Sequence, residues 1–137
     1  MAKVILGNHT AVYAARSDQA MIRQFYGEVL GCKVRVKTDE VDRFQLDGVH
    51  FVFVYQDTAL AADDFLKAIY LELQTDDVEA MRRRIVAFGV KTLEVPDPHL
   101  YFQAPGGQVF KLVGIDEDLT VYEESTSSTP GASAAAA

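Results

Sequence analysis

Apolar side chains recur along the chain with two different periods, and these periods predict helices and strands in a fixed order. Helical spacing of apolar residues predicts one helix from residue 17 to about residue 30 and a second from residue 76 to residue 88. Alternating or continuous apolar runs of strand length surround both helices. The predicted strands are residues 9–15, 32–38, 43–46, 49–55, 69–74, 90–95, 100–103 and 108–113.

Both predicted helices have start and stop signals. Ser17 or Asp18 can cap the first helix, and a glycine follows its last apolar residue. Asp76 can cap the second, and Glu79 three residues later would complete a capping box. Gly89 is expected to end this helix, so both elements have defined boundaries.

The order strand, helix, strand, strand, strand occurs twice, which indicates an internal repeat. Turn signals agree, because Asp47-Gly48 in the first copy corresponds to Gly106-Gly107 in the second. The repeat predicts an α+β fold of two tandem βαβββ modules that face each other across one cup-shaped ligand site. We expect a single domain at residues 1–115, with module one at about 8–56 and module two at about 68–114. Residues 116–137 are acidic and then low in complexity, so disorder is expected there.

Alternation along the strands separates an apolar face, expected to pack on the helices, from a face of mixed character. All three histidines of the chain fall on the mixed face. A wall of apolar side chains with a few polar groups is typical of a ligand pocket, whereas the alternative is an ordinary half-solvated sheet surface. The mixed face comprises His9, Ala11, Tyr13, Arg43, Gln45, His50, Val52, Val54, Tyr70, Glu72, Gln74, His99, Tyr101, Gln103, Val109, Lys111 and Val113.

Composition and charge exclude several classes of protein. The net charge is −7, and the main basic cluster, Arg82 to Arg84, lies within a predicted helix, so nucleic-acid binding is disfavoured. No apolar run approaches the length of a membrane helix, and no membrane partner is expected. Cys32 is the single cysteine, which rules out an internal disulfide; we expect it to be structural rather than nucleophilic. With no signal-like N-terminus, these features predict a cytoplasmic protein.

Several motifs resemble the vicinal oxygen chelate superfamily, which includes glyoxalase I, extradiol dioxygenases and bleomycin-resistance proteins. Ser17-Asp18 leads to Phe25-Tyr26 and then to Glu28-Val29-Leu30-Gly31, which looks like the "D…FY…vLG" pattern of that group. In the second half, the segment at residues 102–113 resembles the family's closing motif. The resemblance spans about residues 8–113 and implies the paired-module fold and a small-molecule ligand.

The resemblance also implies where a divalent metal would bind. Metal-bearing members place His or Glu at positions that correspond here to Ala11, Val52, Tyr70 and Lys111. None of these is a usual ligand, and a lysine ammonium has no lone pair for a metal. We therefore expect the standard metal site to be degenerate and no cofactor to be needed.

A displaced metal site is the alternative. His9 and His50 each precede a standard position by two residues, on strands that the family places side by side. With Glu72 or His99 as a third ligand they could bind iron or zinc.

The remaining polar groups leave other chemistry open. Glu72 and Lys111 are the candidate catalytic pair, as acid and base, although a salt bridge in place of the metal is the simpler interpretation. Arg43 could bind an anionic group or lie at the surface. The tyrosines of the mixed face could stack on an aromatic ligand or pack within the protein.

These observations favour a metal-independent small-molecule-binding protein of the glyoxalase and bleomycin-resistance type. The alternative is a lyase, isomerase or dioxygenase of the same superfamily, which would use Glu72, Lys111 and histidines or the displaced metal site at His9 and His50. The resemblance implies a homodimer, and the identity of the ligand stays open. The candidate ligand-binding residues are His9, Tyr13, Arg43, His50, Tyr70, Glu72, His99, Tyr101 and Lys111.

Overall fold

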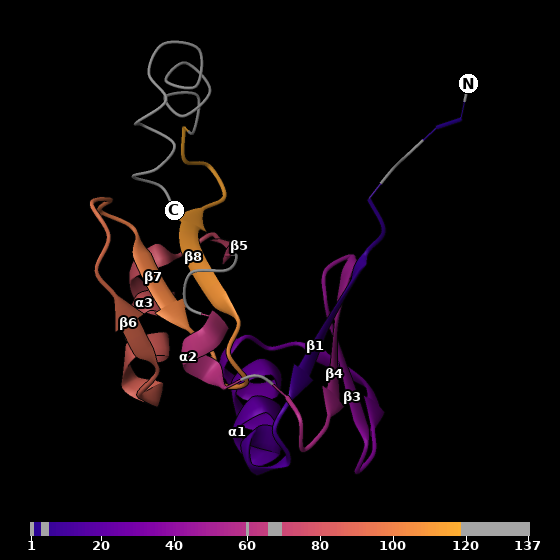
Figure 1. The fold of residues 1–137 in the computed structure, drawn as a ribbon. Helices are drawn as coiled ribbons and strands as arrows, with labels where there is room; N and C mark the ends of the chain where they lie inside the picture. The colour runs from indigo at the N-terminus through magenta and orange to yellow at the C-terminus, as the bar shows by residue number, and fades with distance from the viewer. Residues whose placement is uncertain (1, 4–5, 60, 66–69, 119–137) are drawn as a thin grey trace. The chain divides into compact units, whose positions relative to one another are not determined.

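Two four-stranded mixed sheets form the core of the chain, which confirms the predicted α+β class (Figure 1). The computed structural model describes residues 2–3, 6–59, 61–65 and 70–118. The chain divides into two compact units, Met1–Ala61 and Ala62–Ala137. Each unit contains one sheet, named here sheet A for the first unit and sheet B for the second. The predicted disorder of the C-terminal tail concerns residues that lie mostly outside the described part.

Sheet A has the strand order β1-β4-β3-β2. Its strands are β1 (His9–Ala14), β2 (Lys33–Lys37), β3 (Val41–Leu46) and β4 (Val49–Tyr55). β1 runs parallel to β4, and the other pairs are antiparallel. The hairpin between β3 and β4 turns at Asp47, whose φ of 52° is tolerated by an aspartate in a tight turn.

The first predicted helix forms as three consecutive segments of different pitch. A 3₁₀ turn η1 (Arg16–Asp18) leads into α1 (Gln19–Gln24), and a π-helical turn η2 (Phe25–Val29) completes it. The predicted cap at Ser17 or Asp18 is wrong, because Ser17 lies within η1 and the Asp18 side chain makes no capping hydrogen bond on a backbone that is already helical. Gly31 follows with a φ of 72°, as the sequence predicted for a helix end.

Sheet B repeats this topology with the order β5-β8-β7-β6. Its strands are β5 (Tyr70–Thr75), β6 (Lys91–Leu93), β7 (Leu100–Gln103) and β8 (Val109–Gly114). A short helix α2 (Ala62–Phe65) precedes them, and α3 (Val78–Phe88) follows β5. β6 is shorter than predicted and ends before Pro96, which has no N–H to donate to a ladder.

The N-cap of α3 is Asp77, whereas the sequence predicted Asp76. The Asp77 carboxylate accepts a hydrogen bond from the Ala80 backbone N–H at 3.0 Å. Gly89 ends the helix in the left-handed conformation, with a φ of 96°. The error of one residue arises because either aspartate can cap a helix, and the backbone conformation at the start of α3 decides which one does.

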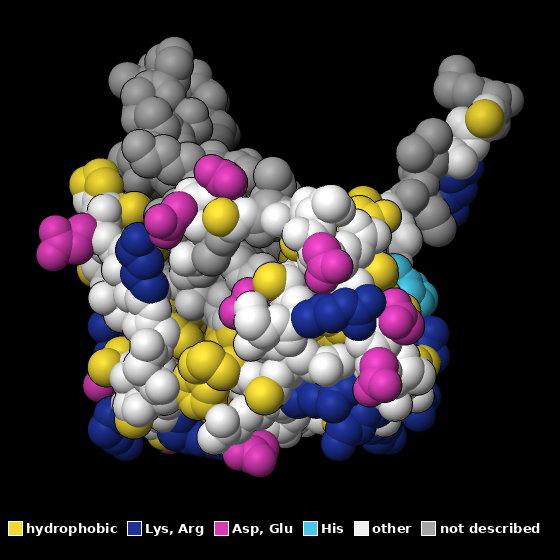
Figure 2. Space-filling model, turned by 60° about the horizontal axis from the view of Figure 1, so that its bottom comes forward, with side chains coloured by type: hydrophobic (Ala, Val, Ile, Leu, Met, Phe, Trp, Pro, Cys, Tyr) yellow, Lys and Arg dark blue, Asp and Glu magenta, His cyan; other side chains and the backbone are white. Residues whose placement is uncertain are grey.

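The described residues include no helix that is long and apolar enough to cross a membrane. Charged side chains cover much of the surface displayed in Figure 2, where basic and acidic groups are interspersed. Buried aromatic and aliphatic side chains supply the core, including Phe25, Tyr26, Phe53, Phe102 and Phe110.

Candidate ligand-binding site

The helix of the first unit covers one face of sheet A. Tyr26 of η2 lies against the rings of Phe44, Phe51 and Phe53, with centroid separations of 5.6, 5.4 and 4.8 Å. Because successive side chains on a strand point to opposite faces, the residues between these aromatics lie on the other face of the sheet. This confirms the separation of faces that the alternation predicted.

The other face of sheet A carries side chains in ordered rows, and we call it the polar face of sheet A. In the first row, the register places His9 beside His50 and His50 beside Gln45. The second row holds Ala11, Val52 and Arg43, and the third begins with the exposed Tyr13. The polar face of sheet A comprises His9, Ala11, Tyr13, Arg43, Gln45, His50, Val52 and Val54.

The two histidines of the first row stack on each other. Their ring centroids are 4.6 Å apart and their planes differ by 11°. Asn8 holds the outer ring in place, because its Oδ1 lies 2.9 Å from His9 Nδ1 while its Nδ2 donates to the Gly48 carbonyl. The sequence interpretation placed both histidines on this face but missed Asn8.

Three buried polar atoms of this face lack a hydrogen-bond partner within the described residues. They are Arg43 Nε, Gln45 Oε1 and His50 Nδ1. A buried polar atom without a partner costs about 1–3 kcal/mol, so native proteins seldom leave several side by side. These atoms stand on the neighbouring strands β3 and β4, which makes this surface suited to a ligand that supplies the partners.

Electrostatics on this face favour an anionic ligand. Burial lowers the pKa of His50, and the neighbouring His9, Arg43 and Arg35 lower it further. The neutral form of the His50 ring is therefore favoured beside the Arg43 guanidinium, which supplies the positive charge that an anion would pair with.

Polar groups on sheet B, in contrast, bind one another. The Lys111 ammonium lies 3.5 Å from Asp97 Oδ2, and both side chains are buried, with 4% and 5% exposed. The Tyr101 hydroxyl donates to the same carboxylate oxygen at 3.1 Å. The Lys111 ammonium also lies 5.8 Å from the centre of the Tyr101 ring. The ion-pair partner of Lys111 is thus Asp97, a residue that sequence reasoning did not select.

His99 links two carboxylates in the same cluster. Its Nδ1 lies 2.5 Å from Asp97 Oδ1, and its Nε2 is hydrogen-bonded to Glu117 Oε1. The other oxygen of Glu117 accepts from the Gly114 backbone N–H at 3.1 Å. An imidazole that meets a carboxylate at each nitrogen must carry a proton on both, so this geometry selects the imidazolium form.

The pKa values in the cluster agree with that geometry. Burial alone would lower the pKa of His99, but its hydrogen bonds to Asp97 and Glu117 outweigh burial and raise it. Burial would likewise raise the pKa of Asp97, but hydrogen bonds from His99 and the nearby Lys111 charge hold it well below its usual range. The cluster therefore consists of two cations and two carboxylates, here called the sheet B ion cluster (Asp97, His99, Lys111, Glu117).

Glu72 and Tyr70 take positions beside this cluster. Glu72 is opposite Lys111 in the β5–β8 register, yet it is exposed and makes no ion pair with any described residue. Tyr70 packs edge-on against Tyr101 with centroids 5.5 Å apart. The structure thus pairs Lys111 with Asp97, and not with Glu72 as the sequence predicted. A signal for Asp97 existed, since it stands two residues before His99, whose backbone N–H it accepts.

The residues at the family's metal positions do not fit a divalent metal. Ala11 and Val52, adjacent in the register, offer no donor atom, and Lys111 brings a cation that is paired with Asp97. The stacked rings of His9 and His50 do not fit either, because the ring lone pairs lie in two nearly parallel planes and cannot converge on one ion. Among the described residues, no group of three or more His, Cys, Asp or Glu side chains is arranged to hold a metal.

Two βαβββ units with polar groups on their sheets define a class of small α+β proteins built on paired modules. The family model described as Glyoxalase/Bleomycin resistance protein/Dioxygenase superfamily matches residues 8–106. The chain therefore belongs to this superfamily, as its motifs predicted. A search of curated proteins finds no match.

Solved structures share the fold at low sequence identity. Lactoylglutathione lyase from Agrobacterium tumefaciens has a TM-score of 0.59 at 17% identity, covering 82% of this chain and 96% of its own. TnmS3, an antibiotic-binding protein from Streptomyces sp. CB03234, has a TM-score of 0.60 at 21% identity, covering 83% and 98%. The fosfomycin resistance protein FosX from Listeria monocytogenes has a TM-score of 0.67 at 17% identity, covering 85% and 94%. These similarities establish the fold.

Proposed function

We propose that this protein binds a small organic anion on the polar face of sheet A without the aid of a divalent metal. The observation that carries the proposal is the set of buried, unpartnered atoms of Arg43, Gln45 and His50 on adjacent strands. A ligand that accepts from Arg43 Nε, donates to Gln45 Oε1 and accepts from or donates to His50 Nδ1 would satisfy all three. The donor-free side chains of Ala11 and Val52 support metal independence.

The neighbouring side chains favour a ligand with a planar or apolar body. The stacked His9 and His50 rings offer a flat edge, and Val52 of β4 lies between them and the third row. Arg43 suits a carboxylate or phosphonate, because its planar fork can bind two oxygens at once. Two structural neighbours bear on the ligand class: TnmS3 is named an antibiotic-binding protein, and a FosX variant was solved with 1S,2S-dihydroxypropylphosphonic acid, although together with Mn(II), which the present proposal does not require.

Calorimetric titration with phenylphosphonate tests whether an organic anion binds, and elemental analysis with EDTA treatment tests whether binding needs a metal. Protein purified without chelator should contain no stoichiometric transition metal by elemental analysis, and EDTA treatment should leave the affinity unchanged. Phenylphosphonate should bind more tightly than benzyl alcohol, which lacks the anionic group. Stoichiometric metal, or binding that EDTA abolishes, would refute metal independence.

Substitution of the arginine locates the site. Arg43→Gln should weaken phenylphosphonate binding about 10- to 100-fold, since it removes a charge-assisted hydrogen bond. Arg83→Gln removes the same charge from the exposed surface of α3, an element of the second unit and not of sheet A, and should leave the affinity unchanged. Equal affinities of the two variants would exclude the polar face of sheet A as the binding site.

The sheet B ion cluster supports a second candidate, a metal-free acid–base enzyme. Lys111 and His99 are cations held by carboxylates, and either could transfer a proton to a substrate. Turnover that depends on Lys111 or Glu72 and survives EDTA would favour this candidate over simple binding. Homodimerisation, a cytoplasmic location and a ligand cup shared by both modules stay predictions; sedimentation velocity tests the first.

A further inference from the structure

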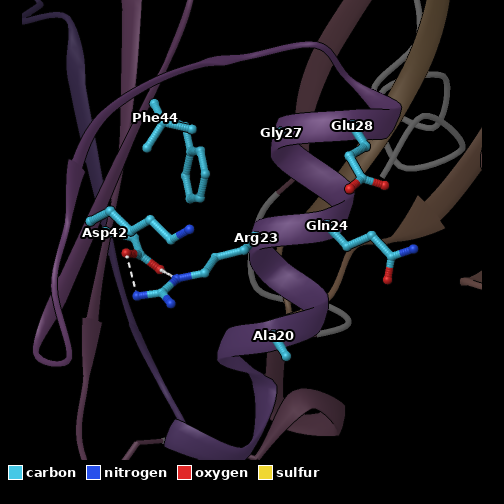
Figure 3. A pocket seen from close by; sticks show the side chains of 9 residues that line it. Ala20, Arg23, Gln24, Gly27, Glu28, Asp42 and Phe44 are labelled. Carbon is cyan, nitrogen blue, oxygen red and sulfur yellow. Dashed lines mark hydrogen bonds and ion pairs between the residues drawn. The ribbon is translucent and has the colours of Figure 1, made fainter.

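A second cavity lies on the helix side of sheet A. It has a volume of 490 Å³, within the range of small-molecule sites. Its walls come from the helix, from β2 and from β3, and Figure 3 shows Arg23 reaching from the helix towards Asp42. Asp42 and Phe44 alternate on β3 with Arg43 and Gln45, so this cavity and the polar face of sheet A use opposite faces of the same strand.

A rigidly held guanidinium forms part of the cavity wall. Arg23 donates from Nε to Asp42 Oδ2 at 2.8 Å and from Nη2 to Asp42 Oδ1 at 3.1 Å. Nη2 also donates to the Thr38 carbonyl at 2.9 Å, and the Tyr55 hydroxyl donates to Asp42 at 2.8 Å. These bonds fix the plane of the guanidinium and leave Nη1 without a hydrogen bond among the described residues. The exposed Lys37 lines the same cavity.

Both walls of the cavity depart from regular geometry. The helix changes to the π-helical turn η2 at Phe25–Val29, and β2 carries a register shift between Val34 and Val36. Such irregularities are enriched at functional sites because they disrupt regular hydrogen bonding. Within η2, Gly27 lines the cavity, and its φ is not positive. A Cβ atom added at this position would have no other atom within 4 Å. No backbone or packing constraint explains this glycine, whereas close approach of a ligand does.

We propose that this cavity binds a small organic carboxylate. Its anionic group would pair with Nη1 of Arg23 and with the Lys37 ammonium, and its apolar part would lie against Gly27 and Val34. Asp42 already balances the charge of Arg23, and Glu28 on the helix wall offsets Lys37, so the lining carries no net charge and favours a monoanion over a phosphate dianion. The site is independent of the function proposed for the polar face of sheet A.

Two-dimensional ¹H–¹⁵N NMR with benzoate tests the proposal on the full chain. Benzoate should shift the backbone signals of Gly27 and Val34 and the Arg23 Nε–H signal in a saturable manner. A ligand of about nine non-hydrogen atoms is expected to bind in the millimolar range. Benzamide has the same shape without the charge and should bind about tenfold more weakly. The absence of saturable shifts, or equal affinity for benzamide, would overturn the proposal.

Three variants separate this cavity from the polar face of sheet A. Gly27→Phe should fill the cavity and abolish the shifts at Val34. Lys37→Gln changes an exposed side chain, so the fold is retained, and should weaken benzoate about tenfold. Arg43→Gln should leave benzoate binding at Val34 intact. Unchanged affinity in Lys37→Gln refutes the assignment even if Gly27→Phe fails to fold, and loss of the shifts in Arg43→Gln would move the site to the other face.

Discussion

Sheets A and B have the same topology but treat their polar side chains in opposite ways. On sheet A, buried polar atoms of Arg43, Gln45 and His50 lack partners among the described residues. On sheet B, the equivalent face buries Lys111, and Asp97 neutralises it. Duplication of one fold has thus produced one face whose polar groups need external partners and one whose polar groups satisfy each other.

This difference between the polar groups of the two sheets indicates that one copy of a repeated fold can be suited to binding while the other is suited to stability. Unpartnered polar atoms lower stability and are retained where function needs them, whereas a saturated ion cluster adds structural definition. Sheet A is therefore expected to gain stability when its polar groups are removed, and sheet B to lose it.

The largest expected effect comes from breaking the sheet B ion cluster. Asp97→Leu removes the carboxylate shared by Lys111, His99 and Tyr101, leaving buried cations with fewer partners. The free energy of unfolding should fall by about 3–5 kcal/mol. Urea denaturation followed by circular dichroism measures this change.

The matched control is Asp57→Leu, because the Asp57 side chain is 92% exposed. Its free energy of unfolding should stay within about 0.5 kcal/mol of the parent value. If Asp97→Leu were equally mild, the cluster would contribute little and the contrast between the sheets would fail.

A smaller effect of opposite sign is expected on sheet A. Gln45→Leu removes the buried, unpartnered Oε1 but also loses the bond from Nε2 to the Asp47 carbonyl. The two terms nearly balance, so unfolding free energy should be unchanged or higher by up to about 1 kcal/mol, while phenylphosphonate binding weakens. A loss of more than about 1 kcal/mol would show that Gln45 is structural, contrary to its assignment as a ligand contact.

Hydrophobic periodicity and turn chemistry predicted the fold because both are local. The duplicated order of elements, the Asp47-Gly48 hairpin and the helix end at Gly89 all depend on neighbours within a few residues. The π-helical turn at η2 was missed, since its hydrophobic spacing is nearly that of an α-helix.

Long-range partners could not be predicted in the same way. The alternation placed Lys111 and His99 on the mixed face, but nothing in the local sequence of Lys111 identifies Asp97 as its partner, and nothing near His99 identifies Glu117, 18 residues later. Asp42 was missed because a carboxylate on an apolar face is explained by Arg23, 19 residues earlier in the chain, and by Tyr55, 13 residues later. Such pairings are decided by tertiary packing, which a single sequence does not display.

The smallest effect is a difference in pH dependence between two histidines. His99 has a pKa raised above 6.5 by Asp97 and Glu117, although burial opposes this, whereas burial and nearby cations lower the pKa of His50. A raised pKa in the folded state gives stability that is complete below about pH 6.5 and is lost as the pH rises through the folded value. A lowered pKa has the opposite sign, so the His50 contribution is present above about pH 6.5 and is lost as the pH falls towards the folded value.

Titration of the histidine ring protons by NMR, with unfolding measured between about pH 5 and pH 8, tests these signs. His99→Gln should lower stability on the acidic side and so remove the decline above pH 6.5, and His50→Gln should remove the decline in stability below pH 6.5. His9 stacks on His50, so His9→Gln serves as the control for that pair. pKa shifts of the same sign for His99 and His50 would contradict the proposed difference between the sheets, because both environments would then stabilise or destabilise the imidazolium form.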